Sequence, residues 1–248
     1  MMVWPAIWRY TPLLILGAVW EAVTQAHLVA PNVLPKLSTV LVAFFHMSQD
    51  DLAYHLGLSL ARGAAGLAAA VIFGVTAGVL MAWYRPIRLL IKPFLQLLYP
   101  LPKSALIPIV IVWLGLGATS KITLIFVGAL LPVVLSTFNA TRGVDHLLVW
   151  SARATGAREP AILFEIVIPA VMPEILNGIR VALALSFILV IAGEIIFAND
   201  GIGYLISLLG ENGDYSGMFA GVLAISVAGL IADRLFVALM HRLTIWRE

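Results

Sequence analysis

Long apolar runs, separated by short polar stretches, follow one another along the whole chain. Six of them reach about the 20 residues needed to cross the hydrocarbon core of a bilayer: residues 10–29, 57–84, 98–117, 120–139, 172–197 and 216–239. The runs lack the alternation of apolar and polar residues that is typical of barrel strands. Because backbone groups that face lipid must be satisfied within a helix or a closed barrel, the pattern predicts an all-α transmembrane protein with six helices.

Two shorter segments lie between these runs. Residues 31–36, PNVLPK, predict a stiff extended turn, and residues 37–50 predict a short segment at the outer membrane surface. Residues 201–212, GIGYLISLLGEN, are too short to cross the bilayer. They predict an interfacial helix or a re-entrant piece, and we expect neither segment to form a separate domain.

The composition predicts a surface covered mainly by lipid. Hydrophobic residues make up 62% of the chain, charged residues only 11%, and the mean hydropathy is +1.03, whereas a soluble domain carries about 25% charged residues. A net charge of +2, with arginines scattered along the chain, argues against a nucleic-acid partner. Glu21 interrupts the first run, which favours a membrane span over a cleaved signal peptide.

No residue pattern predicts a metal site or a catalytic centre. The absence of cysteine excludes disulfides, thiolate metal sites and a cysteine nucleophile. The histidines are dispersed without an HExxH pair, and neither a Ser, His and Asp set nor paired carboxylates occur at catalytic spacing. No GxxxxGK[ST] motif is present, so the sequence predicts no phosphate-binding loop.

Basic residues near the ends of the runs predict the orientation, because Lys and Arg stay preferentially on the cytoplasmic side. One set of ends carries Arg9, Arg85, Arg88, Lys92, Arg142, Arg153, Arg158, Arg242 and Arg247. The other set carries Lys36, Asp50, Asp51, Lys121, Asp200, Glu211 and Asp214. With six spans the first set falls on one side throughout, so we expect both termini and the polar loop at 140–171 to be cytoplasmic.

That loop has an internal pattern of its own. The stretch TRGVDHLLVWSARAT predicts a helix with Asp145 near its start, and Gly156 lies where a left-handed turn would end it. Pro160 suits the first position of a second helix, which would run to a break at Pro169. The loop therefore predicts two short helices joined by a glycine turn, a shape suited to a groove in a partner protein.

The spacing in this loop resembles the EAA loop of the membrane subunits of ABC importers, whose pattern is E-A-A-x-x-x-G-x(9)-I-x-L-P. Ala152, Gly156, Ile166 and Pro169 match that pattern, and Ile168 stands in place of Leu. In that family the loop is a coupling helix pair inserted into a cleft of the ATP-binding subunit. The resemblance implies coupling to an ATPase through these positions: Trp150, Ser151, Ala152, Arg153, Gly156, Ala157, Arg158, Ile166 and Pro169.

The chain departs from the pattern at its first position. Trp150 takes the place of Glu, and Ser151 replaces the first Ala. The loss of the carboxylate removes a polar contact expected at the edge of the joint with the ATP-binding subunit, while the glycine turn and the apolar anchors are kept.

From about residue 54 the chain resembles permeases for sulfonates, taurine, nitrate, bicarbonate and thiamine precursors. The segments SLARGAAG, PLPKSALIPIVIVWLGLG and AGEIIFANDGIGYLI carry this resemblance. It implies a type I importer permease: an amino-terminal helix and outer segment at 1–53, and a five-helix core at 54–248 with a cytoplasmic coupling loop. It also implies a bacterial inner-membrane location and two permeases together, either as a homodimer or as a pair with a similar chain.

The resemblance further implies two ATP-binding subunits inside and a solute-binding protein outside. No cofactor is expected on this chain, and ATP and Mg²⁺ would be bound by the partner subunits. Energy would then reach the chain by contact: when ATP draws the partner subunits together, the coupling loops approach and the bundles above them change from inward-open to outward-open.

Ionisable residues within predicted spans are the candidates for the solute pathway. Glu194 is the first candidate for the pathway or its outer gate, and a buried structural ion pair is the alternative. Lys103 and Ser104 follow a break at Pro100 and Pro102 that can turn backbone groups toward a cavity.

For the arginines Arg62 and Arg180 a structural role is favoured, through carbonyls or a carboxylate such as Glu194 or Glu174, and Glu21 could pair likewise. If Arg62 and Lys103 face the cavity, they would suit a small anion. Tyr99, Trp113 and Tyr204 are interpreted as interface anchors rather than as a stacking site for a solute.

The sequence predicts a translocating subunit of an ATP-driven importer for a small sulfonate, a nitrate-like anion or a thiamine precursor. A stand-alone secondary transporter or channel is the alternative. It is disfavoured because no second copy of residues 90–117, as an inverted repeat would require, follows in the chain.

Overall fold

The computed structural model describes residues 4–47 and 51–245, so Asp50 and Arg247 of the predicted orientation sets lie outside the described residues. Within those two ranges the regular elements are all helical. They are α1 (Trp4–Gln25), α2 (Leu37–Met47), α3 (Asp51–Trp83), α4 (Arg85–Leu98), the 3₁₀ turn η1 (Lys103–Leu106), α5 (Ile107–Leu114), α6 (Ala118–Arg142), α7 (His146–Ala154), α8 (Glu159–Ala161), the π-helical segment η2 (Ile162–Val167), α9 (Ile168–Phe197), α10 (Ile202–Glu211) and α11 (Tyr215–Leu243). The predicted all-α class is confirmed.

Four helices of the described residues are long and apolar enough to cross a membrane: α3, α6, the continuous helix Glu159–Phe197, and α11. A fifth span results if α4 and the Lys103–Leu114 segment, which are bent by 94° at a short break, count as one. The predicted span at 98–117 falls across this bend, because Pro100 and Pro102 interrupt the helix. Helix α1 covers most of the first predicted span but is not among the helices that pass this test.

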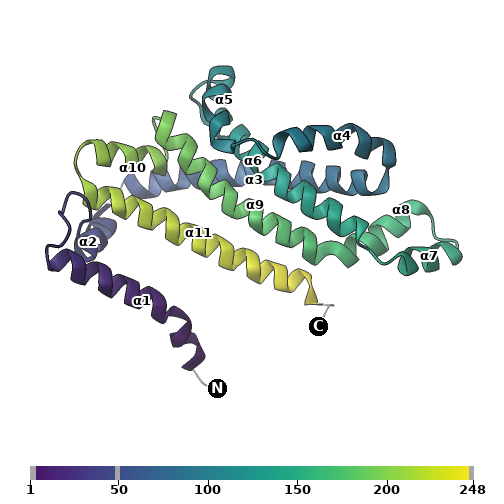
Figure 1. Cartoon of the computed structure of the whole chain (residues 1–248), viewed down its shortest axis with the longest axis horizontal. Helices are drawn as coiled ribbons and strands as arrows, with labels where there is room; N and C mark the ends of the chain where they lie inside the picture. The colour runs from purple at the N-terminus through teal and green to yellow at the C-terminus, as the bar shows by residue number, and fades with distance from the viewer. Residues whose placement is uncertain (1–3, 48–50, 246–248) are drawn as a thin grey trace.

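The helices form an elongated bundle with two distinct ends (Figure 1). Helices α7 and α8 lie at one end, which we call the loop end, and α2 and α10 lie at the other, which we call the far end. Helices α3, α9 and α11 extend between the two ends, and α5 projects from the side of the bundle. The amino-terminal half of α1 and the carboxyl-terminal half of α11 both point toward the loop end.

Glycines on α3 allow it to pack closely against α6. A Cβ atom added to Gly74 would lie 2.8 Å from a side-chain atom of Val133, and one added to Gly78 would lie 2.6 Å from Thr137. Both distances are shorter than real side chains tolerate, so the backbones approach because these positions carry no side chain. Gly74 and Gly78, four residues apart on one side of α3, therefore form the contact surface for α6.

The short helices close the far end of the bundle. A buried apolar cluster there joins α3, α10 and α11; its members are Leu52, Ile202, Leu205, Ile206, Ala224 and Ile225. The segments at 37–47 and 202–211 are both short helices, as the sequence predicts, whereas residues 48–50 lie outside the described residues.

The helix that follows the loop is continuous, so the predicted break at Pro169 is wrong. Helix α8 passes into the π-helical segment Ile162–Val167 and then directly into α9, giving one helical stretch from Glu159 to Phe197. Pro169 lies in the first turn after the π-helical segment, where a missing N–H is better tolerated than within regular α-helix. The helix therefore accommodates Pro169 and continues past it.

Candidate functional site: the 140–171 loop and the central cavity

Helix α7 has well-defined ends. The Asp145 side chain accepts a hydrogen bond of 2.8 Å from the backbone N–H of Leu147, which caps the amino terminus. At the other end Gly156 has φ +84°, its N–H donates to the Arg153 carbonyl at 3.0 Å, and the N–H of Ala157 donates to the Ala152 carbonyl at 3.1 Å. These two bonds form a Schellman motif. The structure confirms the predicted left-handed turn at Gly156.

The inner side of the loop packs onto the end of α3. Ala152 on α7 and Ile162, Leu163 and Val167 after the turn are buried in one cluster with Val79 of α3. Ala157 and Ile166 are partly buried against this cluster. Three of the predicted coupling positions, Ala152, Ala157 and Ile166, therefore hold the two short helices against the bundle. Pro169 is half-buried at the start of α9.

The outer side of the loop is exposed and carries the remaining predicted positions. Trp150 is 62% exposed, and its ring lies 6.4 Å from that of His146. Ser151, Gly156 and Arg158 are also exposed. The loop thus separates its motif into an inner set that packs and an outer set that is free to contact another molecule.

An ion pair connects the two short helices across the glycine turn. Arg153 Nε and Nη2 donate to the two carboxylate oxygens of Glu159 at 2.8 and 3.1 Å. These hydrogen bonds raise the pKa of Arg153 above its ordinary value. Both side chains are about half exposed, so we expect the pair to fix the angle between the helices more than to add stability. Beside it is a hollow of about 620 Å³ that Trp83, Trp150 and Arg153 help to line.

The second group of predicted residues lies at the far end of the bundle. Arg62 of α3 donates to the Glu194 carboxylate of α9 at 2.8 Å and to the Asp200 carboxylate at 2.6 Å. Ser59 donates to Glu194 at 2.6 Å and accepts from the N–H of Ile202 at 2.8 Å. The network joins α3, α9 and the start of α10.

Glu194 is fully buried within this network. Its exposed fraction is 0%, and the N–H of Gly203 donates to its carboxylate at 3.1 Å. Gly201, with φ +102°, and Gly203 both lie against the Glu194 side chain, where a Cβ atom at either position would collide with it. The structure places Glu194 in the ion pair that the sequence left as the alternative, and Arg62 has the carboxylate partner that the structural interpretation names. The gate role of either residue stays a prediction.

Lys103 and Ser104 lie elsewhere, at the wall of a cavity of about 570 Å³. This cavity lies along α6 and α9 and is otherwise lined mainly by apolar side chains, including Leu135 and Leu189. The Lys103 ammonium donates to three carbonyls at the end of α4, those of Leu98, Tyr99 and Leu101, at 2.8 to 3.1 Å. Its hydrogen-bond donors therefore hold the bend between α4 and α5. The structure brings Lys103 and Ser104 together and separates them from Arg62 and Glu194.

Several residues of these networks were not predicted from the sequence. Asp200 shares Arg62 with Glu194, and Lys121, which is 2% exposed, donates to the carbonyls of Leu116 and Phe197. The charge pattern predicts only that both lie at the outer ends of the spans. Arg180 pairs with Asp233 of α11 at 2.6 Å.

Arg180 therefore pairs with Asp233 and not with Glu194 or Glu174, the carboxylates named from the sequence. Glu21 makes hydrogen bonds with Gln25 and Ser38. The only sequence signal for Asp200 is its place in the segment AGEIIFANDGIG, where two glycines follow a buried acid.

The fold and the loop have counterparts among known proteins. The chain is 31% identical over 240 residues to the taurine transport system permease protein of Escherichia coli (strain K12), covering 94% of this chain and 87% of that protein. It is also 31% identical over 232 residues to a permease protein of Bacillus subtilis (strain 168) named for aliphatic sulfonates transport, covering 93% and 84%.

The fold is similar to that of the MetNI methionine ABC transporter in an inward-facing conformation. The TM-score is 0.66 at 19% identity, covering 77% of this chain and 94% of that one. The predicted type I importer permease fold is thereby confirmed.

A family model matches most of the chain as well. The matched residues are 70–245, which include the 140–171 loop, the cavity at Lys103 and the buried Glu194. The chain therefore belongs to the family of inner membrane components of binding-protein-dependent transport systems.

Proposed function

We propose that this chain is the permease subunit of an ATP-driven importer that carries a small sulfonate across the bacterial inner membrane. It is a membrane subunit without ATP-hydrolysing residues, and two separate ATP-binding subunits would bind ATP and Mg²⁺. A binding protein would deliver the solute at the far end of the bundle. A second copy of the chain would complete the transport pathway.

The geometry of the 140–171 loop is the observation that carries this proposal. Two short helices meet at the Schellman turn of Gly156, and their inner side chains are fixed on Val79 of α3. Their outer face presents Trp150 to solvent. The chain has no nucleotide-binding motif of its own, so the energy of ATP has to come from another subunit. The exposed face of the loop is the surface through which such a subunit would bind and displace the bundle.

The orientation of the proposed subunit follows from the same loop. If the loop contacts cytoplasmic ATP-binding subunits, then the loop end is cytoplasmic and the far end faces outward. The amino-terminal half of α1 and the carboxyl-terminal half of α11 both point toward the loop end (Figure 1), which supports cytoplasmic positions for both termini. Arg85, Arg142, Arg153 and Arg158, which are predicted to be cytoplasmic, lie in the loop or at the helix ends nearest to it, in agreement with this orientation.

The sulfonate assignment is supported by the relatives. One is named for taurine, which is itself a sulfonate, and another for aliphatic sulfonates. The cavity near Lys103 is mostly apolar, which suits the hydrocarbon part of such a solute.

Reconstitution in liposomes tests the proposal. The chain, its ATP-binding subunit and its binding protein are assembled, and uptake of radiolabelled taurine, an alkanesulfonate, nitrate and a formylaminopyrimidine is measured with and without ATP. We expect sulfonate uptake that requires both ATP and the ATP-binding subunit. Uptake by the chain alone would show a secondary transporter or channel, and uptake of nitrate or the pyrimidine in place of sulfonates would overturn the solute assignment.

A further inference from the structure

A groove beside the cavity at Lys103 gathers three of the basic residues that the charge pattern predicts to be cytoplasmic. It lies between α4 and α6, has a volume of about 450 Å³, and is lined in part by Arg88, Lys92 and Arg142. Gln96 and Asn139 contribute amide groups to the same groove. Among the residues that the structure describes, no acidic side chain lines it.

The described part of the chain offers no ion-pair partner for the positive charges of the groove. None of the ion pairs found among residues 4–47 and 51–245 includes Arg88, Lys92 or Arg142. Arg142 instead lies over the ring of Phe138, with its guanidinium carbon 5.7 Å from the ring centroid. This contact orients the guanidinium without cancelling its charge.

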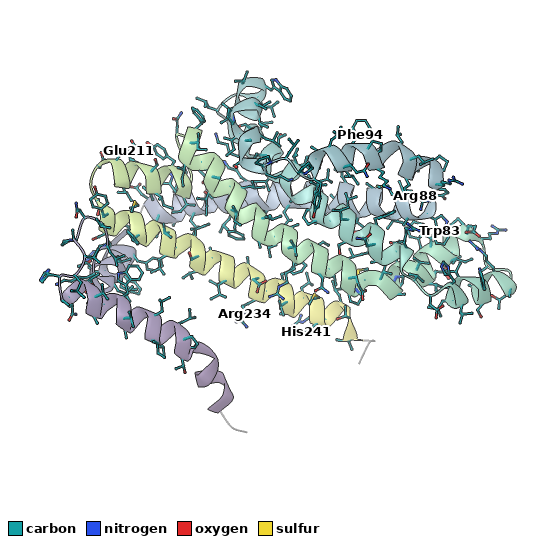
Figure 2. The ribbon with its side chains drawn as sticks, viewed as in Figure 1. Trp83, Arg88, Phe94, Glu211, Arg234 and His241 are labelled. Atoms are coloured by element: carbon teal, nitrogen blue, oxygen red, sulfur yellow. The ribbon has the colours of Figure 1, made fainter. Side chains whose placement is uncertain are left out.

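The basic residues of α4 occupy one face of an amphipathic helix. Arg88, Lys92 and Gln96 follow one another at spacings of four residues, which places them along one side. The opposite side is apolar: Phe94 is 62% exposed and Leu90 is 68% exposed. In Figure 2 Arg88 is at the end of α4 near Trp83 and the loop end, and Phe94 is on the outer side of the helix. The charged side of α4 therefore faces the groove and the apolar side faces away from the bundle.

The groove adjoins the cavity that contains Lys103, because Tyr99 and Leu135 line both spaces. From there the lining of the groove continues along α4 and α6 to Arg88 and Arg142, near the ends of these helices closest to the loop end. Because the Lys103 ammonium is occupied by three carbonyls, the first unpaired cations along this route are those of the groove.

We infer that this groove binds the oxyanion group of the solute as it leaves the cavity toward the loop end. This inference rests on the proposed function and adds an exit site to it. Two guanidinium groups and an ammonium recognise a sulfonate through charge-assisted hydrogen bonds, and the amides of Gln96 and Asn139 supply further donors. The headgroup of an anionic phospholipid shares this chemistry, so the test has to separate the two sources.

The absence of cysteine in the chain makes a direct test available. A single Gln96→Cys variant places one thiol in the groove, and its rates of reaction with a sulfonate-bearing and a trimethylammonium-bearing methanethiosulfonate reagent are compared. The comparison is repeated in the background Arg88→Gln, Lys92→Gln, Arg142→Gln. A matched background, Arg85→Gln, Arg234→Gln, Arg242→Gln, removes the same charge from basic residues that do not line the groove.

We expect the ratio of anionic to cationic reaction rates to fall on the order of tenfold or more when the groove charges are removed. The matched background should leave the ratio nearly unchanged. Millimolar ethanesulfonate should slow the anionic reagent in the original background only. An equal fall in both backgrounds would show a general effect of net charge and would overturn the inference.

A comparison of two lipid compositions distinguishes a sulfonate solute from the headgroup of an anionic phospholipid. The measurements are made in nanodiscs of phosphatidylcholine alone and in nanodiscs that also contain phosphatidylglycerol. We expect the rate ratio to be similar in both. If phosphatidylglycerol abolishes the preference for the anionic reagent and the protection by ethanesulfonate, then the groove is a lipid headgroup site and the solute route is wrong.

Transport by the reconstituted importer distinguishes failure of this inference from failure of the proposed function. The groove variant should take up taurine several-fold more slowly than the matched variant, while its binding protein still stimulates ATP hydrolysis. Equal uptake by the two variants would overturn the exit site and leave the importer intact. If the unsubstituted importer moves no sulfonate, the proposed solute is wrong, and the reagent ratio still decides whether the groove selects oxyanions.

Discussion

Arg62 of α3 and Glu194 of α9 are 132 residues apart in the chain, and their side chains form an ion pair of 2.8 Å in which neither is more than 7% exposed. The pair fastens the far end of α3 to the end of α9. The carboxylate and carbonyl of Asp200, and the N–H of Gly203 in the first turn of α10, complete the contacts around it.

Glu194→Gln is expected to lower the free energy of unfolding by about 3–5 kcal/mol, because it leaves the Arg62 charge buried without its full partner. The double substitution Arg62→Met, Glu194→Met should recover much of that loss, because it removes both charges. Chemical unfolding in detergent measures both effects. A Glu194→Gln protein of normal stability with altered uptake or basal ATP hydrolysis would instead support a role in the outer gate.

Gly156→Val is expected to uncouple ATP hydrolysis from uptake. A Cβ atom at this position meets no atom within 4 Å, so the effect comes from the backbone at φ +84° and not from a collision. That conformation costs a residue with a Cβ about 1–2 kcal/mol. Uptake per ATP hydrolysed should fall in Gly156→Val and be largely kept in Gly156→Asn, because asparagine tolerates the left-handed region. Equal uptake per ATP hydrolysed in the two variants would contradict a role of the left-handed turn in coupling.

Trp150→Ala is expected to weaken binding of the ATP-binding subunit roughly tenfold or more, because a large exposed aromatic side chain at an interface centre is a typical hot spot. The fold should be unaffected, since the side chain is 62% exposed. Titration of the purified subunit onto the chain in nanodiscs measures the affinity. Trp150→Phe serves as the control that keeps an aromatic ring. Undiminished binding by Trp150→Ala would show that the ATP-binding subunit contacts other residues of the loop.

Gly78→Val is expected to destabilise the bundle by about 1–3 kcal/mol or more, because it forces α3 away from α6 at Thr137. Gly63→Ala on the same helix is the matched control, since nothing lies within 4 Å of its added Cβ atom. Thermal unfolding of both variants in detergent compares the two positions. Equal melting temperatures would contradict the close approach of the helices.

Features that depend on neighbouring residues in the chain could be predicted from the sequence. The turn at Gly156 and the cap at Asp145 obey local rules of helix ends, and the structure has both. Pro169 shows the limit of such rules. The proline rule predicts a break there, but the π-helical segment before it accommodates the missing N–H and the helix continues.

Partners that meet only after folding could not be predicted with the same certainty. The charge pattern predicts Lys121 at the outer end of a span, but it does not predict that Lys121 is 2% exposed and donates to the carbonyl of Phe197, 76 residues away. The choice between a gate and an ion pair for Glu194 also depended on the position of Arg62 in space. Hydropathy and spacing do not contain that information.

The unbroken helix from Glu159 to Phe197 has a mechanical consequence. At a rise of about 1.5 Å per residue, its α9 part from Ile168 to Glu194 is a rod of roughly 40 Å. If that part turned as a rigid body about its far end, a swing of about 10° would carry Ile168 through roughly 7 Å. A displacement of the loop that passes the change of direction at the π-helical segment (Figure 1) would therefore act along α9 on the ion pair of Arg62 and Glu194.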